Sequence, residues 1–192
     1  MHADADPVVH DEPLPYVPQL DRRPPEQVDL VVIHCTELPD LATAREYGER
    51  VLYPLSNTGN SGHFYVDRDG SVHRWVGVDC VAHHTRGYNP RSVGVELVNT
   101  GRYPDWLDSR RQAMDEPYPQ AQVAGLVALL RQLRRELPAL RFIAGHEDLD
   151  TDEVAASDDH HRKVRRKRDP GPMFPWGDVL AAIDLQRLAP PA

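Results

Sequence analysis

The sequence predicts a single α/β domain in which a mixed central β-sheet is flanked by helices. Three observations predict it: short apolar runs rich in β-branched residues, an Asp-Gly turn between two such runs, and one long amphipathic helix. Strand and helix patterns alternate along the chain, which is typical of a mixed sheet with helices packed on it. At 192 residues the chain is long enough for one domain with a substantial core.

The first 27 residues differ in composition from the remainder. Residues 1–27 carry repeated prolines among acidic residues, so they are predicted to form an extended arm rather than a packed element. The domain itself is expected to span residues 28–188. Within it, residues 147–166 form a stretch that is acidic at first and then basic, and we predict a solvated surface loop there.

The first half of the domain is expected to contain a strand, a helix and a hairpin. Asp29–His34 is a short apolar run typical of a buried strand. Residues 43–52 are predicted to be a helix, with Thr43 as its N-cap. A hairpin is predicted over residues 63–76, because Arg68-Asp69-Gly70 separates two β-rich runs.

The second half is expected to alternate strands and helices. Residues 92–98 form a second strand pattern. A long amphipathic helix is predicted from Pro119 to Leu137, where Pro119 suits the first turn and Pro138 ends the helix. A strand over 140–144 and a final helix over 176–188 complete the pattern.

Charge and composition exclude several classes of protein. The net charge of -8 argues against nucleic acid or an anionic membrane surface as the main partner. No apolar run reaches the roughly 18 residues that a membrane span needs. The acidic start, Met1–His10, lacks the features of a signal peptide, so a cytoplasmic protein is expected, with a periplasmic or exported protein that has lost its leader as the alternative. The sequence carries no signal for an oligomeric state.

Two histidines and one aspartate are the strongest candidates for a metal site. His34 and His146 each follow an apolar run, where a rigid strand passes into a loop. Asp169 precedes Pro170, which favours an extended backbone at the aspartate. Two imidazoles and a carboxylate can hold a catalytic zinc ion and leave one position open. From spacing alone, hydrogen-bonded core histidines are about equally expected.

Two charged residues are candidates for acid–base chemistry and charge stabilisation. Glu96 lies in the middle of an apolar strand pattern, where a carboxylate is costly unless it has a partner or a function. An outward-facing residue on a half-exposed sheet is the alternative. Lys167 lies two residues before Asp169 and could project toward the same site, or it could be one more charge in a basic run.

Several motifs occur together in the order of one known family. They are Val32-Ile33-His34-Cys35-Thr36, Ser61-Gly62-His63-Phe64, Asp67-Arg68-Asp69-Gly70, Ser92-Val93-Gly94-Val95-Glu96, Gly145-His146 and Asp169-Pro170-Gly171-Pro172. In this order they resemble the zinc-dependent N-acetylmuramoyl-L-alanine amidases of the AmpD type, relatives of phage lysozyme-type amidases and peptidoglycan recognition proteins. The resemblance covers residues 28–188 and implies that family's fold.

The resemblance implies a complete catalytic set. His34, His146 and Asp169 would bind one Zn²⁺, Glu96 would be the general base, and Lys167 would stabilise the oxyanion. The substrate would be peptidoglycan or a muropeptide, cut between N-acetylmuramic acid and L-alanine. The long charged stretch makes other basic residues competitors for the role of Lys167, namely Lys163, Arg165 and Arg166.

Three further residues are predicted to contact the substrate. His84 falls where the family often has a histidine lining the substrate groove, and the nearby Arg86 and Asn89 are plausible contacts for an anionic stem peptide. His83 stands where many relatives have a tryptophan, a departure that bears on substrate preference.

The sequence fits other functions less well than this one. A non-catalytic peptidoglycan-binding protein of the same fold typically lacks a metal ligand or the base, whereas this chain keeps them. A cysteine peptidase using Cys35 or Cys80 is disfavoured, because Cys35 is expected at a strand end and Cys80 in a loop rather than in an electropositive setting. A nucleic-acid module lacks an aromatic platform, and a zinc deaminase lacks a Pro-Cys-x-x-Cys motif.

Overall fold

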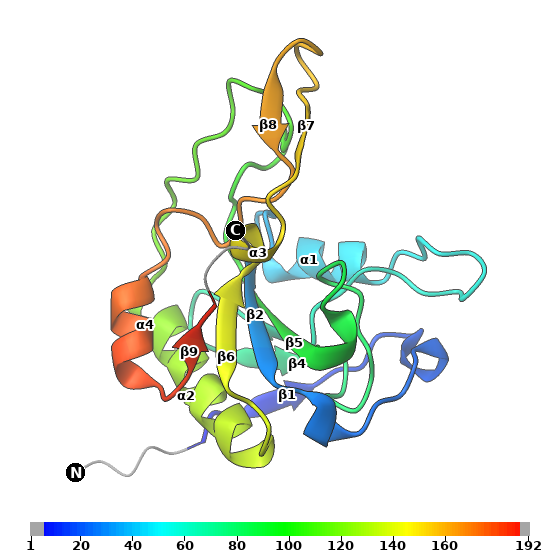
Figure 1. The fold of residues 1–192 in the computed structure, drawn as a ribbon, viewed down its shortest axis with the longest axis vertical. Helices are drawn as coiled ribbons and strands as arrows, with labels where there is room; N and C mark the ends of the chain where they lie inside the picture. The colour runs from blue at the N-terminus through cyan, green and yellow to red at the C-terminus, as the bar shows by residue number, and fades with distance from the viewer. Residues whose placement is uncertain (1–5, 189–192) are drawn as a thin grey trace.

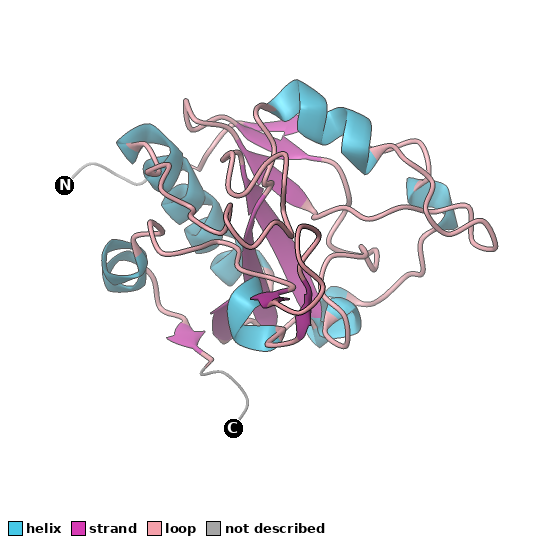
Figure 2. Cartoon of the chain, turned by 90° about the horizontal axis from the view of Figure 1, so that it is seen from above, coloured by secondary structure: helices cyan, strands magenta, loops and turns pink. Residues whose placement is uncertain are grey.

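The computed structural model describes residues 6–188 and contains one large sheet with helices on both sides (Figures 1 and 2). The strand order is β1-β4-β3-β5-β2-β6-β9, and among these neighbours β3 and β4 alone pair antiparallel. The predicted mixed sheet is therefore confirmed. Its strands are β1 (Val9–Asp11), β2 (Leu30–Cys35), β3 (Phe64–Val66), β4 (Val72–Arg74), β5 (Ser92–Leu97), β6 (Phe142–Gly145) and β9 (Gln186–Arg187).

The helices and a small hairpin surround this sheet. The helices are α1 (Leu41–Gly48), α2 (Gln120–Glu136), α3 (His146–Leu149) and α4 (Trp176–Ala182), with short 3-10 turns at Val17–Gln19, Pro25–Gln27 and Asn89–Arg91. A separate two-stranded hairpin is formed by β7 (Glu153–Ala155) and β8 (Lys163–Arg165). No helix within residues 6–188 combines the length and the apolar character that crossing a bilayer requires.

The two central strands present different chemistry on their two faces. Side chains alternate across a strand, so every second residue points to the same face. Val31 and Ile33 of β2 and Val93 and Val95 of β5 are fully buried in the main core. The apolar face of α2 belongs to the same core cluster, with Leu126, Leu129, Leu130 and Leu133. His34 and Glu96 alternate with these residues, so they lie on the face away from α2.

Residues 6–27 pack on the domain, so the prediction of an unpacked arm is wrong for them; residues 1–5 of the predicted arm lie outside the described residues. β1 pairs in parallel with β4, the strand that follows the Asp-Gly turn. Leu14, Tyr16 and Leu20 are at most 5% exposed and share a second core cluster with Trp75. The Tyr16 hydroxyl donates to the Gly48 carbonyl over 2.8 Å. The prolines interrupt regular structure, but the apolar residues between them supply the packing surface.

The charged stretch also contains ordered structure. Residues 151–163 are mostly exposed, as predicted, but the prediction of a loop over residues 147–166 misses regular structure, because most of α3 and the whole β7–β8 hairpin lie in this stretch. Asp148 is 6% exposed and forms an ion pair with Arg187, and the buried Asp150 forms an ion pair with Arg166. Each buried aspartate has a cationic partner: Arg166 at the end of the same stretch for Asp150, and Arg187, outside the stretch, for Asp148.

Two helix boundaries differ from the predicted ones. α1 is capped by Asp40, whose side chain accepts from the Thr43 N–H over 2.7 Å, so Thr43 is not the N-cap. α4 ends at Ala182, and the residues after it continue into β9, which pairs in parallel with β6. Pairing with an existing strand edge satisfies the backbone of this segment in place of further helical turns.

Candidate metal centre and catalytic cavity

Two neighbouring parallel strands place His34 beside Glu96. The two residues are opposite each other in the β2–β5 register, and His34 Nδ1 lies 3.9 Å from Glu96 Oε1. His34 is 2% exposed, whereas the Glu96 side chain is 15% exposed. A side chain at Gly62 would place Cβ 2.8 Å from Glu96 Cγ, so the glycine leaves room for the carboxylate.

His146 is held at the junction between β6 and α3. The strand ends at Gly145, whose N–H donates to Asp148 Oδ2 over 2.9 Å. The Arg187 guanidinium donates to both oxygens of the same carboxylate over 3.0–3.2 Å. This pair fixes the turn that carries His146, because the buried Asp148 carboxylate cannot move without losing both its Gly145 and its Arg187 partners.

Asp169 approaches from a separate segment after the β7–β8 hairpin. Its backbone carbonyl accepts from the Glu147 N–H over 2.9 Å, which ties it to the residue after His146. The following carbonyl, of Pro170, accepts from the Tyr118 hydroxyl over 2.7 Å. These two contacts hold the aspartate against the turn after β6.

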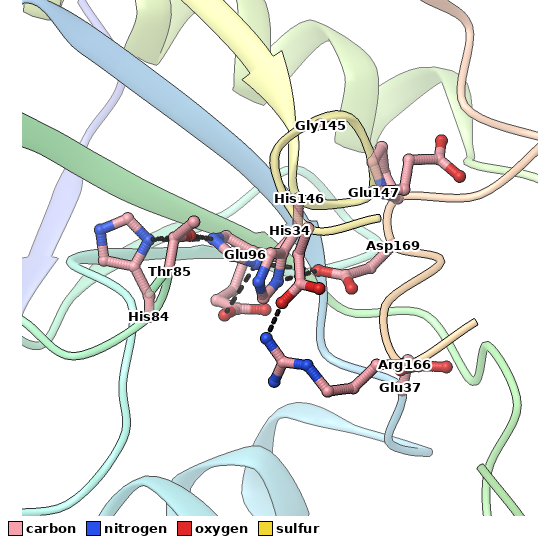
Figure 3. A network of polar contacts seen from close by, with 12 residues as sticks. His34, Glu37, His84, Thr85, Glu96, Gly145, His146, Glu147, Arg166 and Asp169 are labelled. Atoms are coloured by element: carbon pink, nitrogen blue, oxygen red, sulfur yellow. Dashed lines mark hydrogen bonds and ion pairs between the residues drawn. The ribbon is translucent and has the colours of Figure 1, made fainter. Parts of the chain in front are cut away.

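The three predicted ligands converge on one point, as the close-up in Figure 3 shows. His34 Nδ1 lies 2.8 Å and His146 Nδ1 3.1 Å from the same atom, Asp169 Oδ2. One donor atom from each residue lies within 4.8 Å of the others, and all three residues are buried. Asp169 Oδ1 is buried without a hydrogen-bond partner. An orphaned carboxylate oxygen beside two imidazoles fits a tetrahedral zinc site with an open position.

His84 contacts the back of His34. Its Nδ1 lies 3.0 Å from His34 Nε2, and its Nε2 lies 3.2 Å from the Ser92 hydroxyl, which donates to the Tyr88 carbonyl. Thr85 Oγ1 lies within 3.4 Å of the same His34 nitrogen (Figure 3). Such contacts fix the ring orientation of a metal-ligating histidine. His84 lines the cavity as predicted, but both ring nitrogens are engaged by protein groups.

Burial and neighbouring charges shift the pKa values of the groups around the centre. Burial lowers the pKa of His34 to about 4, against the opposing contact with Asp169, so the ring is neutral at pH 7. Burial and then the Asp169 charge raise the pKa of Glu96 well above its usual range, and Lys167 opposes them. A neutral imidazole is the metal-binding form, and a carboxylate with a raised pKa suits proton transfer near neutral pH.

A cavity of about 830 Å³ opens over this centre, and every predicted site residue lines it. The Arg86 side chain is 74% exposed, and its guanidinium lies 3.8 Å from the Asp152 carboxylate. Asn89 Oδ1 accepts from the backbone N–H groups of His84 and Thr85, so its side chain also shapes the loop.

Of the competitors for the oxyanion role, Arg166 lines the cavity with Lys167, while the side chain of Arg165 donates to backbone carbonyls outside it.

A buried ion pair that the sequence does not predict lies beside the centre. Arg102 donates to both oxygens of Glu37 over 2.6 and 2.9 Å, and its side chain is 1% exposed. The same guanidinium donates to the Arg165 carbonyl over 3.0 Å. The pair therefore anchors the backbone just before Arg166 and Lys167. Both residues lie in loops, where no periodic pattern marks them.

Neither cysteine has the setting of a nucleophile. Cys35 and Cys80 are buried and unpaired. Burial raises the pKa of both thiols, for Cys35 well above its usual range, with nearby carboxylates acting in the same direction. A thiol nucleophile needs the reverse, a lowered pKa in an electropositive setting.

Comparison with known sequences places the chain in a family. Residues 24–172 match the Amidase_2 family, described as N-acetylmuramoyl-L-alanine amidase. This match covers most of the chain, so the protein belongs to the Amidase_2 family.

Individual relatives agree with this assignment. An endolysin of Enterobacteria phage K11 is 34% identical over 85 residues, which is 44% of this chain and 52% of that protein. The chain spans about half the length of the curated relatives it matches. The amidase LysC from Clostridium intestinale has a TM-score of 0.65 at 20% identity, over 93% of this chain and 99% of that one. AmiD from E. coli has a TM-score of 0.61 at 20% identity, over 81% of this chain and 57% of that one. Its structure was solved with the substrate anhydro-N-acetylmuramic acid-L-Ala-D-gamma-Glu-L-Lys. These two likenesses concern the fold.

Proposed function

We propose that this protein is a zinc-dependent N-acetylmuramoyl-L-alanine amidase, which hydrolyses the amide between N-acetylmuramic acid and L-alanine in peptidoglycan or muropeptides. One observation carries the proposal: His34, His146 and Asp169 present donor atoms to a single point, with the Glu96 carboxylate beside it. The muramyl peptide bound to AmiD contains the same kind of linkage, which supports this choice of substrate.

His34, His146 and Asp169 would hold one zinc ion, which when bound polarises a carbonyl and lowers the pKa of a water. Glu96 has the position to take the proton of the attacking water on a carboxylate oxygen. It then delivers that proton to the nitrogen of L-alanine as the C–N bond breaks. Lys167 provides a positive charge in the cavity for the oxygen of the tetrahedral intermediate. The products are a free lactyl carboxylate and a peptide with a free amino terminus.

The residues around this set keep it in place. The contact between His84 and His34 Nε2 leaves His34 Nδ1 directed at Asp169. The Asp148–Arg187 pair holds the His146 turn, and the Glu37–Arg102 pair holds the backbone before Lys167. Preorganised groups of this kind need no reorganisation during the reaction.

The test is mass spectrometry of a purified muramyl peptide after incubation with the protein, with and without a zinc chelator. We expect separate sugar and L-alanine-headed peptide without chelator, and intact substrate with it. The Glu96→Gln variant, loaded with zinc, controls for a contaminating amidase. Binding without cleavage by zinc-replete protein, on the muramyl peptide and on intact wall, would support instead a non-catalytic peptidoglycan-binding protein of this fold.

A further inference from the structure

The largest concentration of exposed apolar side chains in the described residues lies at the edge of the cavity. The exposed large hydrophobic residues are Val8, Val51, Leu52, Tyr53, Leu55, Tyr103 and Met173. Most of them lie within the five residues 51–55, and Leu55 is fully exposed. We call residues 51–60 the rim loop; it follows α1 and extends away from the body of the molecule (Figure 1). A cluster of this kind on a protein surface marks an interaction site more often than isolated apolar residues do.

The rim loop is held by its own hydrogen bonds. Tyr53 and Thr58 form an antiparallel bridge, and the Ser56 and Thr58 hydroxyls lie 2.7 Å apart. Thr58 is 1% exposed. A Cβ at Gly59 would lie 2.0 Å from the Arg50 carbonyl oxygen, so this close approach requires glycine. The loop therefore presents its apolar side chains from a defined backbone.

Tyr53 is oriented within this loop. Its hydroxyl donates to Asn60 Oδ1 over 2.8 Å. The edge of its ring meets His83 with centroids 5.2 Å apart and an interplanar angle of 81°. Leu52, Tyr53, Asn60 and His83 all line the cavity that holds the candidate metal centre. The apolar surface of the rim loop is thus continuous with the catalytic cavity.

The composition of the rim loop selects the kind of ligand. Residues 51–60 contain no charged side chain, although 27% of the whole chain is charged. A surface that binds anionic lipid is expected to carry Lys and Arg, and one that binds the carboxylates of a stem peptide is expected to carry cations. Apolar groups, one oriented aromatic ring, hydroxyls and an amide suit a neutral ligand with both C–H faces and hydroxyls, which is the chemistry of a sugar.

We propose that the rim loop binds the neutral glycan chain of peptidoglycan, beyond the muramic acid whose amide is cut. The negative face of the Tyr53 ring would meet the C–H face of a sugar, and Leu55 would extend the apolar surface. This inference rests on the proposed function for the position of the muramic acid, and it names the polymeric wall, rather than a single disaccharide unit, as the substrate this surface serves.

The direct test uses a probe without lactyl or peptide groups. The full chain, labelled with ¹⁵N, is titrated with the tetramer of N-acetylglucosamine and followed by NMR. We expect shifted amide signals in residues 51–60 and at His83. Tyr53→Ala is expected to weaken binding by about threefold to tenfold, the range for an aromatic contact, and Tyr53→Phe by less. Val8→Ser removes an isolated exposed apolar group outside the cavity, and this variant should bind as the parent does.

A second test compares two substrates for each variant. We expect Tyr53→Ala and Leu55→Ser to lower the ratio of the rate on intact wall to the rate on a single disaccharide peptide by about threefold or more. An unchanged ratio, with no loop signals shifted by the tetramer, overturns the glycan proposal even if the protein cleaves both substrates. Binding to phosphatidylglycerol–phosphatidylethanolamine vesicles that Leu55→Ser abolishes, without tetramer binding, overturns it in favour of a membrane surface. Tetramer binding by a protein without amidase activity refutes the proposed function and leaves the sugar-binding surface in place.

Discussion

The floor and the rim of the cavity are built in opposite ways. The floor consists of His34, Glu96, His146 and Asp169, which lie at strand ends or on a segment tied to them and contact one another directly. The rim consists of the rim loop and of Arg86, which are exposed and held mainly by local contacts or by one weak ion pair.

This difference shows how burial determines the role of a polar group. On the floor, low solvation moves the pKa values of His34 and Glu96 in opposite directions and prepares the groups for metal binding and proton transfer. At the rim, water screens each charge, so a single residue adds a little affinity and no chemistry. Substitutions on the floor should therefore cost orders of magnitude, and substitutions at the rim only small factors.

The strongest test of the floor is Glu96→Gln. We expect turnover of a muramyl peptide to fall by about 10²- to 10⁴-fold, because general-base catalysis is lost. Zinc content, measured by atomic absorption on the purified variant, should match the parent, since Glu96 is not a ligand. Loss of zinc from this variant would contradict the assignment.

Asp169→Ala should weaken zinc binding rather than remove the general base. The variant removes one of three ligands, so we expect zinc affinity to fall at least about 10-fold. Competition with a chromogenic chelator measures this affinity without any substrate. Undiminished affinity would exclude Asp169 as a ligand.

Arg102→Met tests the support beneath the floor. It leaves the buried Glu37 carboxylate unpaired, and we expect a loss of about 3–5 kcal/mol in the free energy of unfolding. Urea denaturation provides the measurement. The double variant Arg102→Met, Glu37→Met should recover part of the loss, because it leaves no unpaired charge. Equal stability of the single variant and the parent would show that the pair has no supporting role.

Lys167→Met tests the oxyanion role against a matched residue of the same basic run. We expect kcat to fall about 10²-fold, as for the loss of one oxyanion donor. Lys163→Met, on the exposed hairpin, should keep the parental kcat because Lys163 does not line the cavity. Similar losses in both variants would refute a specific role for Lys167.

The smallest effect is expected at the rim, for Arg86→Ala. Loss of one screened cation should raise KM for an anionic muramyl peptide by about twofold to fivefold. Adding salt should remove most of the difference. Arg110→Ala, which removes an equally exposed arginine paired with Asp108, provides the control. A large fall in kcat would show that Arg86 takes part in catalysis rather than only in substrate binding.

The sequence by itself determined the elements whose signal is local. Alternating and continuous apolar runs predicted β2 and β5 to within a residue or two, and the 3.6-residue period predicted α2. The ordered motifs also predicted His34, His146 and Asp169 as metal ligands, and the structure brings one candidate donor atom of each within 4.8 Å of the others. Functional residues at the ends of buried strands carry a strong positional signal, because the strand fixes where each side chain points.

Only the tertiary structure decided the contacts between distant segments. Residues 6–27 pack because Trp75 and β4 offer them a surface, and Asp148 is buried because Arg187 reaches it from 39 residues further along the chain. The Glu37–Arg102 pair and the continuity of the rim loop with the cavity likewise depend on chain folding. The sequence shows how polar a residue is. The free energy of burying that residue depends on whether a partner lies beside it, and only the fold defines where the partner lies.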